Sequence, residues 1–398
     1  MENIAIFRAP EAIFYSRGSH KKVGEEAAHR GSKALIISDQ IMNQLGYVDE
    51  CKTYLEASNV QSVIYLGVAS EPTDDYVAEA LELFGKEQCD LVISVGGGSC
   101  IDTAKAVAVL ATNGGYIGDY MGGKKLATQR PIPHIAIPTT AGTGSEATDV
   151  TVITSSSTDV KMMIKQPAFM PNVAIVDPIL TLSSPRSVTS ATGVDALSHA
   201  VEAYLSRKAH PMTDSIALSA MKLIVANILT AYSDGENIDA REAMSLGALQ
   251  AGMAFSNASV CLVHGMSRPI GALFHVPHGI SNAMLLPAVL EFSQEACVDR
   301  LADIGRIFEP ENESPSNKEA AEIAVQSIKK LCLQLRIPNL RGWGIDETAF
   351  KHAVAKMTAD AIESGSPANN PRVPTADELA ELYRTCYDYQ LATEEEKV

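Results

Sequence analysis

The part of the chain before Ser183 alternates short apolar runs with amphipathic stretches, and this alternation constrains the fold more than any other feature. Runs such as Lys33–Ser38 and Leu91–Val95 are short, mostly apolar and rich in β-branched residues. Such runs alternating with helical patterns predict a parallel sheet that is covered by helices on both faces. The runs expected to form strands are Ala12–Tyr15, Lys33–Ser38, Ser62–Leu66, Leu91–Val95, Pro133–Ile137, Thr148–Thr154 and Ala174–Val176.

Helical periodicity replaces the strand-like runs after Ser183-Ser184-Pro185. A chain of 398 residues is also longer than one ordinary core supports. We therefore predict an α/β domain over residues 1–184 and an all-helical domain over residues 185–398, with a solvated acidic end at Glu394–Lys397. The predicted helices of the second domain are Val188–Tyr204, Met212–Ala231, Ala240–Phe255, Ser281–Phe292, Lys318–Leu335 and Thr348–Met357.

The net charge of −16 argues against binding to nucleic acid or to an anionic membrane surface. The chain has seven cysteines and no Cys-x-x-Cys pair, which favours buried thiols in a reducing compartment. The N-terminus does not resemble a signal peptide, and no apolar run reaches the roughly 18–20 residues of a membrane span. These features predict a cytoplasmic protein.

A glycine run at residues 96–99 follows a predicted strand and precedes a predicted helix. Gly97 and Gly98 would let a ligand approach the backbone closely, and the helix N-terminus suits a pyrophosphate. Ser99 is expected to be the N-cap, with Asp102 as the acid of a capping box. The run is not Gly-x-Gly-x-x-Gly, and a tight turn without a ligand is the alternative reading.

Two further features suit a nucleotide. The loop Pro138–Ser145 is rich in hydroxyl groups and could bind phosphate or ribose oxygens, although a polar surface loop fits as well. Asp39 follows a predicted strand, where an acid can accept both ribose hydroxyls and repel a 2′-phosphate, which favours NAD over NADP. Asp39 could also cap the helix that begins at Gln40, and the two roles are compatible.

Asp195 and His199 are four residues apart on a predicted helix, so their side chains share one face. His264 and His278 follow, and five of the nine histidines of the chain fall between residues 199 and 278. One carboxylate and three imidazoles form a complete ligand set for a divalent metal. Oxygen and nitrogen ligands without thiolate suit Fe(II), Zn, Mn or Co, and the sequence does not rank them.

Several segments resemble the signatures of the iron-containing (group III) alcohol dehydrogenases. This resemblance implies a Rossmann-like parallel-sheet domain followed by an all-α domain, in a dehydroquinate-synthase-like architecture with a cleft between them. It also implies NAD, a divalent metal, a small alcohol or aldehyde substrate, and a homodimer or larger oligomer. The segments, which run in order along nearly the whole chain, are Gly-Gly-Gly-Ser-Cys-Ile-Asp-Thr-Ala-Lys, Ile-Pro-Thr-Thr-Ala-Gly-Thr-Gly-Ser-Glu, Gly-Val-Asp-Ala-Leu-Ser-His-Ala, Ala-Phe-Ser-Asn-Ala, His-Gly-Met-Ser-Arg-Pro-Ile-Gly, Val-Pro-His-Gly and Asn-Pro-Arg-Val-Pro-Thr.

The resemblance also assigns roles to residues. It implies Fe(II) as the metal, with zinc as the alternative, and Asp39 as the NAD-selecting acid. Lys161 matches a lysine near the nicotinamide ribose. The metal ligands would be Asp195, His199, His264 and His278, the pyrophosphate loop Gly97, Gly98, Ser99 and Asp102, and the second cofactor loop Thr139, Thr140 and Thr143.

Arg268 departs from the family pattern, because many members have a histidine at this position, four residues after the ligand matched by His264. That histidine lines the active site, and an arginine cannot relay a proton at neutral pH. Arg268 could bind an anionic group of the substrate, or it could form a structural salt bridge that closes the cleft. His275 is a candidate for the substitute proton relay.

The expected activity is therefore NAD-linked oxidation of a small primary alcohol, diol or hydroxy acid, together with reduction of its aldehyde. One alternative is a metal-dependent lyase or hydrolase on a dehydroquinate-synthase-like scaffold. Another is a reductase dedicated to a small anionic aldehyde. A nucleotide-sensing protein with a vestigial metal site is a third, which the complete ligand set argues against.

Overall fold

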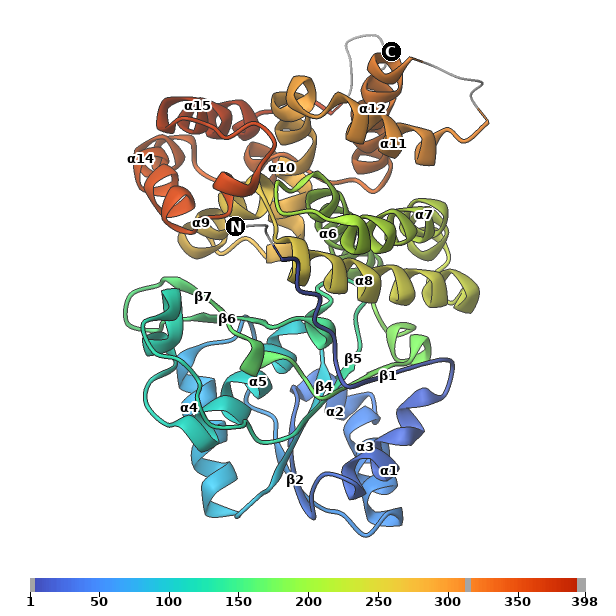
Figure 1. Cartoon of the computed structure of the whole chain (residues 1–398), viewed down its shortest axis with the longest axis vertical. Coiled ribbons are helices and arrows are strands. Elements are labelled where there is room, and N and C mark those ends of the chain that lie inside the picture. The colour runs from blue at the N-terminus through green and yellow to red at the C-terminus, as the bar shows by residue number, and fades with distance from the viewer. Residues whose placement is uncertain (1–3, 312–315, 392–398) are drawn as a thin grey trace.

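In a computed structural model that describes residues 4–311 and 316–391, parallel strands form the centre of the first half of the chain (Figure 1). All lie within one residue of the runs expected from the sequence. The six strands, in the order β1-β8-β5-β4-β2-β3 across the sheet, are β1 (Ala12–Tyr15), β8 (Val173–Val176), β5 (His134–Pro138), β4 (Leu91–Gly96), β2 (Lys33–Ile37) and β3 (Gln61–Tyr65).

Successive side chains of these strands face opposite sides of the sheet and fill two apolar cores. In β2, Leu35 and Ile37 pack with the helices α4 (Asp74–Lys86) and α5 (Gly98–Asn113), whereas Ala34 and Ile36 pack with α1 (Val23–Ala28) and α3 (Tyr47–Ala57). Burial on both faces explains why the strands are apolar throughout. The short helix α2 (Gln40–Gln44) follows β2 directly.

The chain reverses its direction of travel across the sheet between β2 and β4. From β2 it moves outward to β3, returns to β4 beside β2, and continues on the other side to β5. In open parallel sheets, ligands bind beyond the carboxyl ends of the strands at such a point. The segments that follow β2 and β4 contain Asp39 and the glycine run at residues 96–99.

A separate antiparallel hairpin lies beside the sheet. The predicted strand Thr148–Thr154 is shorter than expected, as β6 (Val150–Thr154), and pairs with β7 (Lys161–Lys165). A single 3₁₀ turn, Ser19–Lys22, precedes α1. Further 3₁₀ helices span Ile117–Gly123, Ser145–Ala147, Pro167–Phe169, Pro178–Thr181, Gln294–Ala296 and Pro367–Asn369.

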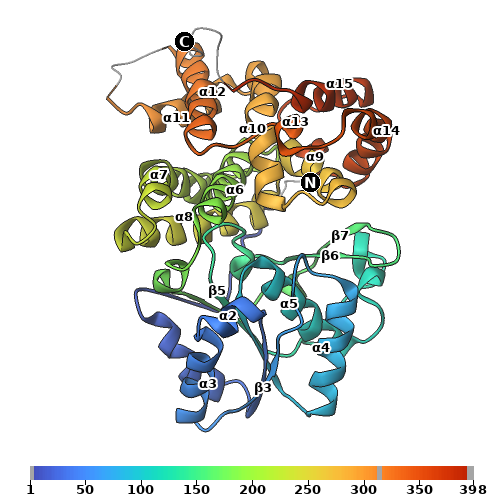
Figure 2. The same cartoon turned by 180° about the vertical axis from the view of Figure 1, so that it is seen from behind.

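Helices make up the rest of the described chain, with no strand after Val176 in residues 4–311 and 316–391. They share one apolar core (Figures 1 and 2). The division at residues 184 and 185 stays a prediction, and the end at Glu394–Lys397 lies outside the described residues. The helices are α6 (Arg186–Leu205), α7 (Pro211–Ser233), α8 (Ile238–Ala258), α9 (Leu262–Phe274), α10 (His278–Ser293), α11 (Val298–Phe308), α12 (Asn317–Gln334), α13 (Leu340–Trp343), α14 (Glu347–Glu363) and α15 (Ala376–Tyr387).

The two halves meet along α8, which lies at the lower edge of the helical half in Figure 1. A small apolar cluster joins Ala147 and Val176 of the sheet half to Leu249 of α8. At Gly144, with φ +60°, the backbone reaches Gly252 of α8 so closely that a Cβ built on Gly144 would lie 2.5 Å from the Gly252 Cα. The junction therefore depends on two glycines that face each other.

One described helix, α7, is long and apolar enough to cross a membrane by length and composition alone. The pair α8 and α9, bent by 102°, passes the same test only if it is taken as one span. The apolar length of α7 exceeds what we expected from the sequence. Its buried residues, including Met221 and Ile224, belong to the helical core. The expectation of buried thiols is confirmed, because all seven cysteines are free and buried.

Candidate metal and cofactor site

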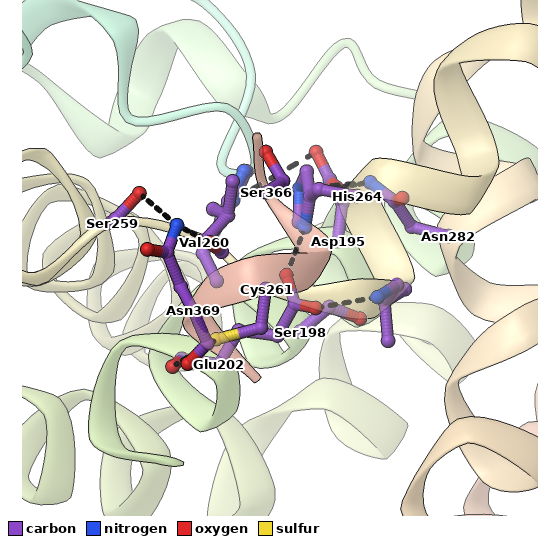
Figure 3. Close-up of polar contacts among 12 residues, drawn as sticks. Asp195, Ser198, Glu202, Ser259, Val260, Cys261, His264, Asn282, Ser366 and Asn369 are labelled. Carbon is purple, nitrogen blue, oxygen red and sulfur yellow. Dashed lines mark hydrogen bonds and ion pairs between the residues drawn. The ribbon is translucent and has the colours of Figure 1, made fainter. Parts of the chain in front are cut away.

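Three helices bring the predicted metal ligands together. Asp195 and His199 lie one turn apart on α6, His264 lies on α9, and His278 is the first residue of α10. One ligand atom from each of the four side chains lies within 4.8 Å of the others. Asp195, His199 and His264 are buried, and His278 is partly exposed. Figure 3 shows Asp195 and His264 facing each other.

The charges of this cluster suit a divalent cation. Burial alone would raise the pKa of the Asp195 carboxyl, but the imidazoles of His199, His278 and His264 outweigh it and hold the pKa below its usual range. Burial lowers the pKa of His199 to about 4 and also lowers that of His278, so both rings are neutral near pH 7. The buried Nδ1 of His199 has no hydrogen-bond partner among residues 4–311 and 316–391. Burial opposes protonation of His264, but the carboxylates of Glu202 and Asp195 outweigh it and raise the pKa of His264. An ionised carboxylate beside the neutral imidazoles of His199 and His278 suits a divalent metal, which would also replace the proton on the metal-facing nitrogen of His264.

Glu202 supports the cluster from behind, and we did not predict it from the sequence. Its Oε2 lies 2.5 Å from Nδ1 of His264, and its Oε1 accepts a hydrogen bond of 2.6 Å from the Val263 backbone N–H (Figure 3). A carboxylate in this position fixes the orientation and tautomer of a ligating imidazole. The signal was present in the sequence, because Asp195, His199 and Glu202 repeat at helical spacing on one face of α6.

Asn282 is a second residue that the sequence reasoning missed. Its side chain is fully buried on α10, one turn after His278. The Nδ2 atom lies 2.7 Å from Oδ1 of Asp195 and 3.0 Å from Nε2 of His264, while Oδ1 has no partner. Asn282 thus ties α10 to the ligands on the other two helices.

The glycine run begins α5 in a way that differs from our prediction. The helix starts at Gly98 and its N-cap is Gly97, so Ser99 lies inside the first turn and is not the cap. Asp102 is not part of a capping box. Its carboxylate accepts hydrogen bonds from Ser145 Oγ at 2.5 Å and from the Val152 backbone N–H at 2.8 Å, which ties α5 to the following loop and β6. The helix N-terminus, without a side-chain cap, keeps free N–H groups for a ligand.

The threonine loop lies against the glycine run. The Thr139 backbone N–H donates to the Gly96 carbonyl at 3.1 Å, and the buried Thr139 Oγ1 has no partner. Thr140 Oγ1 would lie 3.6 Å from a Cβ added to Gly97. A Cβ added to Gly98 would lie only 2.8 Å from Thr143 Cγ2. The two loops therefore pack as one unit at the carboxyl edge of the sheet.

Asp39 caps α2, as the alternative reading of the sequence allowed. Its Oδ1 accepts a hydrogen bond of 2.8 Å from the Met42 backbone N–H. Its Oδ2 lies 3.7 Å from Cys100 Sγ, beside the glycine run. One oxygen of Asp39 therefore caps α2, while the other lies beside Cys100 at the start of α5.

One cavity of about 220 Å³ connects the glycine run to the metal cluster. Lys161 lies in its wall, where it forms an ion pair with Glu71. Phe255 stacks on His199 with ring centroids 4.3 Å apart and closes the cavity on the helical side. The predicted site residues in the cavity wall are Gly98, Ser99, Asp102, Thr143, Lys161, His199, His264, Arg268 and His278.

The two residues predicted to act on the substrate lie in different places. Arg268 lies in the cavity wall, and its Nη1 donates to Ser366 Oγ at 2.9 Å. His275 is exposed and does not line the cavity. The reason is local: His275 ends α9 in the left-handed conformation, with φ +53°, where the chain turns toward α10. The structure thus does not bring His275 to the metal cluster.

Comparisons with known proteins agree with this geometry. The model of the iron-containing alcohol dehydrogenase family matches residues 10–178, and that of the C-terminal part of the Fe-containing alcohol dehydrogenase family matches residues 189–387. A 1,3-propanediol dehydrogenase of Citrobacter freundii is 38% identical over 385 residues, which is 96% of this chain and 98% of that protein. An NAD-dependent methanol dehydrogenase of Bacillus methanolicus is 38% identical over 381 residues, 95% of this chain and 98% of that protein. The crystal structure of a 1,3-propanediol oxidoreductase superposes with a TM-score of 0.92 at 36% identity, covering 97% of this chain and all of that one.

Proposed function

The chain belongs to the iron-containing alcohol dehydrogenase family, and from this membership we propose that it interconverts small primary alcohols or diols with their aldehydes, using NAD(H) and a divalent metal. One observation carries the proposal: Gly98 and Ser99 of the glycine run line a single cavity together with His199, His264 and His278, three of the four residues of the metal cluster. The related proteins are named as dehydrogenases of propanediol and methanol, so the lyase or hydrolase alternative is not favoured.

The metal would be held by Asp195, His199, His264 and His278, with Fe(II) as the ion that the family name indicates. When bound, the metal supplies Lewis acidity at the substrate oxygen, and NAD supplies the hydride acceptor. Glu202 orients His264 for this role, and Asn282 keeps Asp195 and His264 at a fixed separation. Phe255 excludes water from the helical side of the site.

The cofactor would lie along the carboxyl edge of the sheet. Free N–H groups at Gly98 and Ser99 suit its pyrophosphate, and Thr139, Thr140 and Thr143 offer hydroxyl groups from the adjoining loop. The oxygen of Asp39 that does not cap α2 would accept the adenosine ribose hydroxyls, which would favour NAD over NADP. Lys161, which lies in the cavity wall with Gly98 and His278, would bind the nicotinamide ribose once Glu71 releases it.

We propose a cytoplasmic homodimer or larger oligomer that acts on small molecules and not on nucleic acid or membranes. The charge of −16 and the seven free thiols support the partners and the compartment. Oligomerisation rests on the family alone, and light scattering of the purified protein would test it.

The test is the formation of NADH, followed at ~340 nm, with a panel of short alcohols and diols. The enzyme is assayed as purified, after chelation, and after reloading with Fe(II) or Zn(II). We expect activity to fall on chelation and to return on reloading. Activity that survives complete metal removal, verified by elemental analysis, would contradict the proposed function.

A further inference from the structure

Arg268 is a buried cation in the cavity wall. The residue is only 9% exposed, and the one side-chain hydrogen bond that its guanidinium makes within the described residues, to Ser366 Oγ, uses one of five N–H donors. No ion pair involves Arg268 in residues 4–311 and 316–391. Burial lowers the pKa of Arg268 to about 10, against the attraction of the Glu202 carboxylate, so the group is charged at neutral pH. A buried charge without an ion-pair partner is costly, and such a partner is then expected from a ligand.

The other cations of the cavity wall differ from Arg268 in this respect. Lys161 is paired with Glu71, and Lys165 lies 3.6 Å from Asp149. Arg268 thus has no acid within ion-pair distance among the described residues, and Glu202, the acid that acts on its pKa, is held by Val263 and His264. The salt bridge that we considered from the sequence is not formed within residues 4–311 and 316–391.

The position of Arg268 on α9 sets its distance from the reacting centre. It lies one helical turn after His264, so the Cβ atoms of the two residues are roughly 5–6 Å apart on one face of the helix. This proximity favours a short ligand, with few atoms between the group held by Arg268 and the oxygen held at the metal cluster.

Ser259 provides a second polar contact in the same cavity. It ends α8 with φ +70° and ψ +160°, a conformation that costs energy for any residue with a Cβ and that often occurs at binding sites. Its Oγ accepts a hydrogen bond of 3.0 Å from Asn369 Nδ2. Because that contact uses an acceptor lone pair, the Ser259 hydroxyl hydrogen remains available to a ligand.

We propose that Arg268 binds an anionic group of the substrate, which makes a short primary alcohol with a carboxylate or sulfonate the preferred class. The inference rests on the proposed function and narrows its substrate. The reaction removes two hydrogens from the carbinol, one as hydride to NAD⁺ and one as a proton to solvent, and gives an aldehyde that still bears the anion. The planar guanidinium pairs with carboxylate or sulfonate oxygens through parallel N–H donors.

The kinetic test compares alcohols that differ in charge. 3-Hydroxypropanoate and 2-hydroxyethanesulfonate are compared with 1,3-propanediol on the holoenzyme. We expect a higher kcat/KM for at least one anion than for the diol. Arg268→Gln should lower the ratio of kcat/KM for that anion to kcat/KM for the diol about 10- to 100-fold, because a charge-assisted contact is lost. Arg268→Lys should lie between, since it keeps the charge without the planar fork.

Lys165→Gln is the matched control, because it removes another cation from the same wall. Lys165→Gln should change the ratio of kcat/KM for the anion to kcat/KM for the diol far less than Arg268→Gln does. A preference of the wild type for the diol over both anions would overturn the proposal. An equal fall in this ratio in Lys165→Gln and Arg268→Gln would also overturn the proposal, because the loss of any positive charge from the cavity wall would then explain the effect.

A binding measurement separates this inference from the proposed function. Propanoate and ethanesulfonate carry the anion but no hydroxyl group, and calorimetric titration into the holoenzyme measures their affinity without turnover. We expect weaker binding in Arg268→Gln than in the wild type. If the wild type oxidised no alcohol but bound these anions through Arg268, the proposed function would fail and the anion site would stand. Equal affinity in both proteins would refute the anion site.

Discussion

The carboxylate of Glu202 lies 2.5 Å from Nδ1 of His264, on the side of the ring that faces away from Asp195. The same carboxylate accepts the Val263 backbone N–H, so its position is fixed by α9 itself. Because Glu202 accepts hydrogen bonds, it favours the proton on Nδ1 and leaves Nε2 of His264 free to bind a metal. The tautomer of one ligand is thus set by a residue that belongs to another helix.

We expect Glu202→Gln to weaken metal binding about 10- to 100-fold. Its Oε1 can still accept from Val263, but its amide then presents N–H groups to His264 Nδ1 and favours the tautomer with Nε2 blocked. Competition with a chelator of known affinity measures the metal dissociation constant. Glu322→Gln, at an exposed position of α12, is the control. An unchanged constant in Glu202→Gln would remove Glu202 from the metal site.

His264→Ala should lower metal content and alcohol oxidation together, because it deletes one of four ligands and leaves Glu202 buried without its partner. Metal analysis of the purified variant and the rate of NADH formation check the two effects. His352→Ala, on the exposed face of α14, should change neither. Retention of both metal and activity in His264→Ala would exclude His264 as a ligand.

Asp39 combines helix capping with the proposed choice of cofactor, and two variants separate these roles. Asp39→Asn keeps a good N-cap and removes the charge, whereas Asp39→Gly also removes the side chain. Both variants should raise kcat/KM for NADP relative to kcat/KM for NAD. The increase should be about tenfold if repulsion between the Asp39 carboxylate and the 2′-phosphate of NADP costs about 1.4 kcal/mol. Steady-state kinetics with each cofactor give the ratio. If the ratio stayed at the wild-type value in both variants, Asp39 would act only as a cap.

Stability in mild acid should depend on His134. Its Nε2 lies 2.8 Å from Ser94 Oγ, and burial together with Lys105 lowers the pKa of His134 to about 3. The unfolded pKa is near 6.5, so below about pH 6.5 the unfolded chain takes up a proton that the folded protein does not. The contribution of neutral His134 to the free energy of unfolding is therefore complete above about pH 6.5 and is lost progressively as the pH falls toward 3.

Urea unfolding at several pH values between 4 and 7 tests this linkage. The free energy of unfolding of the wild type should fall as the pH is lowered. In His134→Gln this fall should be smaller by about 1.4 kcal/mol for each pH unit, because one titrating group has been removed. His352→Gln, at an exposed position, should follow the wild type. Identical slopes for His134→Gln and the wild type would show that His134 does not titrate as inferred.

Gly252→Ala should destabilise the protein by about 1–3 kcal/mol, because the new Cβ would lie 2.6 Å from the Gly144 carbonyl oxygen and the backbones would have to separate. Gly85→Ala is the opposite case: a Cβ at this exposed position of α4 meets nothing within 4 Å. There the change should stabilise by about 0.5–1 kcal/mol. Denaturant midpoints measure both, and equal effects of the same sign would contradict the close contact at the junction.

The central strands could be predicted to within one residue because burial on both faces makes their sequences continuously apolar, as in β2 and β4. Helix α9 could not be predicted with comparable ease. It contains Gly265, Pro269 and Gly271, which obscure the helical pattern, and it is stabilised by tertiary packing within the helical core. The hairpin partner β7 was missed because its pairing with β6 is not encoded locally.

The site was predictable in part for the same physical reasons. The spacing of Asp195 and His199 on one helix is a local property, and the structure brings His264 and His278 to them. The environments of Arg268 and His275 depend on tertiary contacts and on one left-handed turn, which local patterns do not reveal. Ser99 was misassigned as a cap because the helix begins at Gly98, two residues before the start that a cap at Ser99 would give.

The contact between Gly144 and Gly252 bears on how such a chain can be recombined. Gly144 belongs to the loop beyond the glycine run, and Gly252 lies on α8, more than a hundred residues later. A hybrid that takes its first half from one relative and its second half from another must therefore inherit a glycine at both positions. Although the two halves look modular, one half can be exchanged for that of a relative only if both partners keep the glycines of this contact.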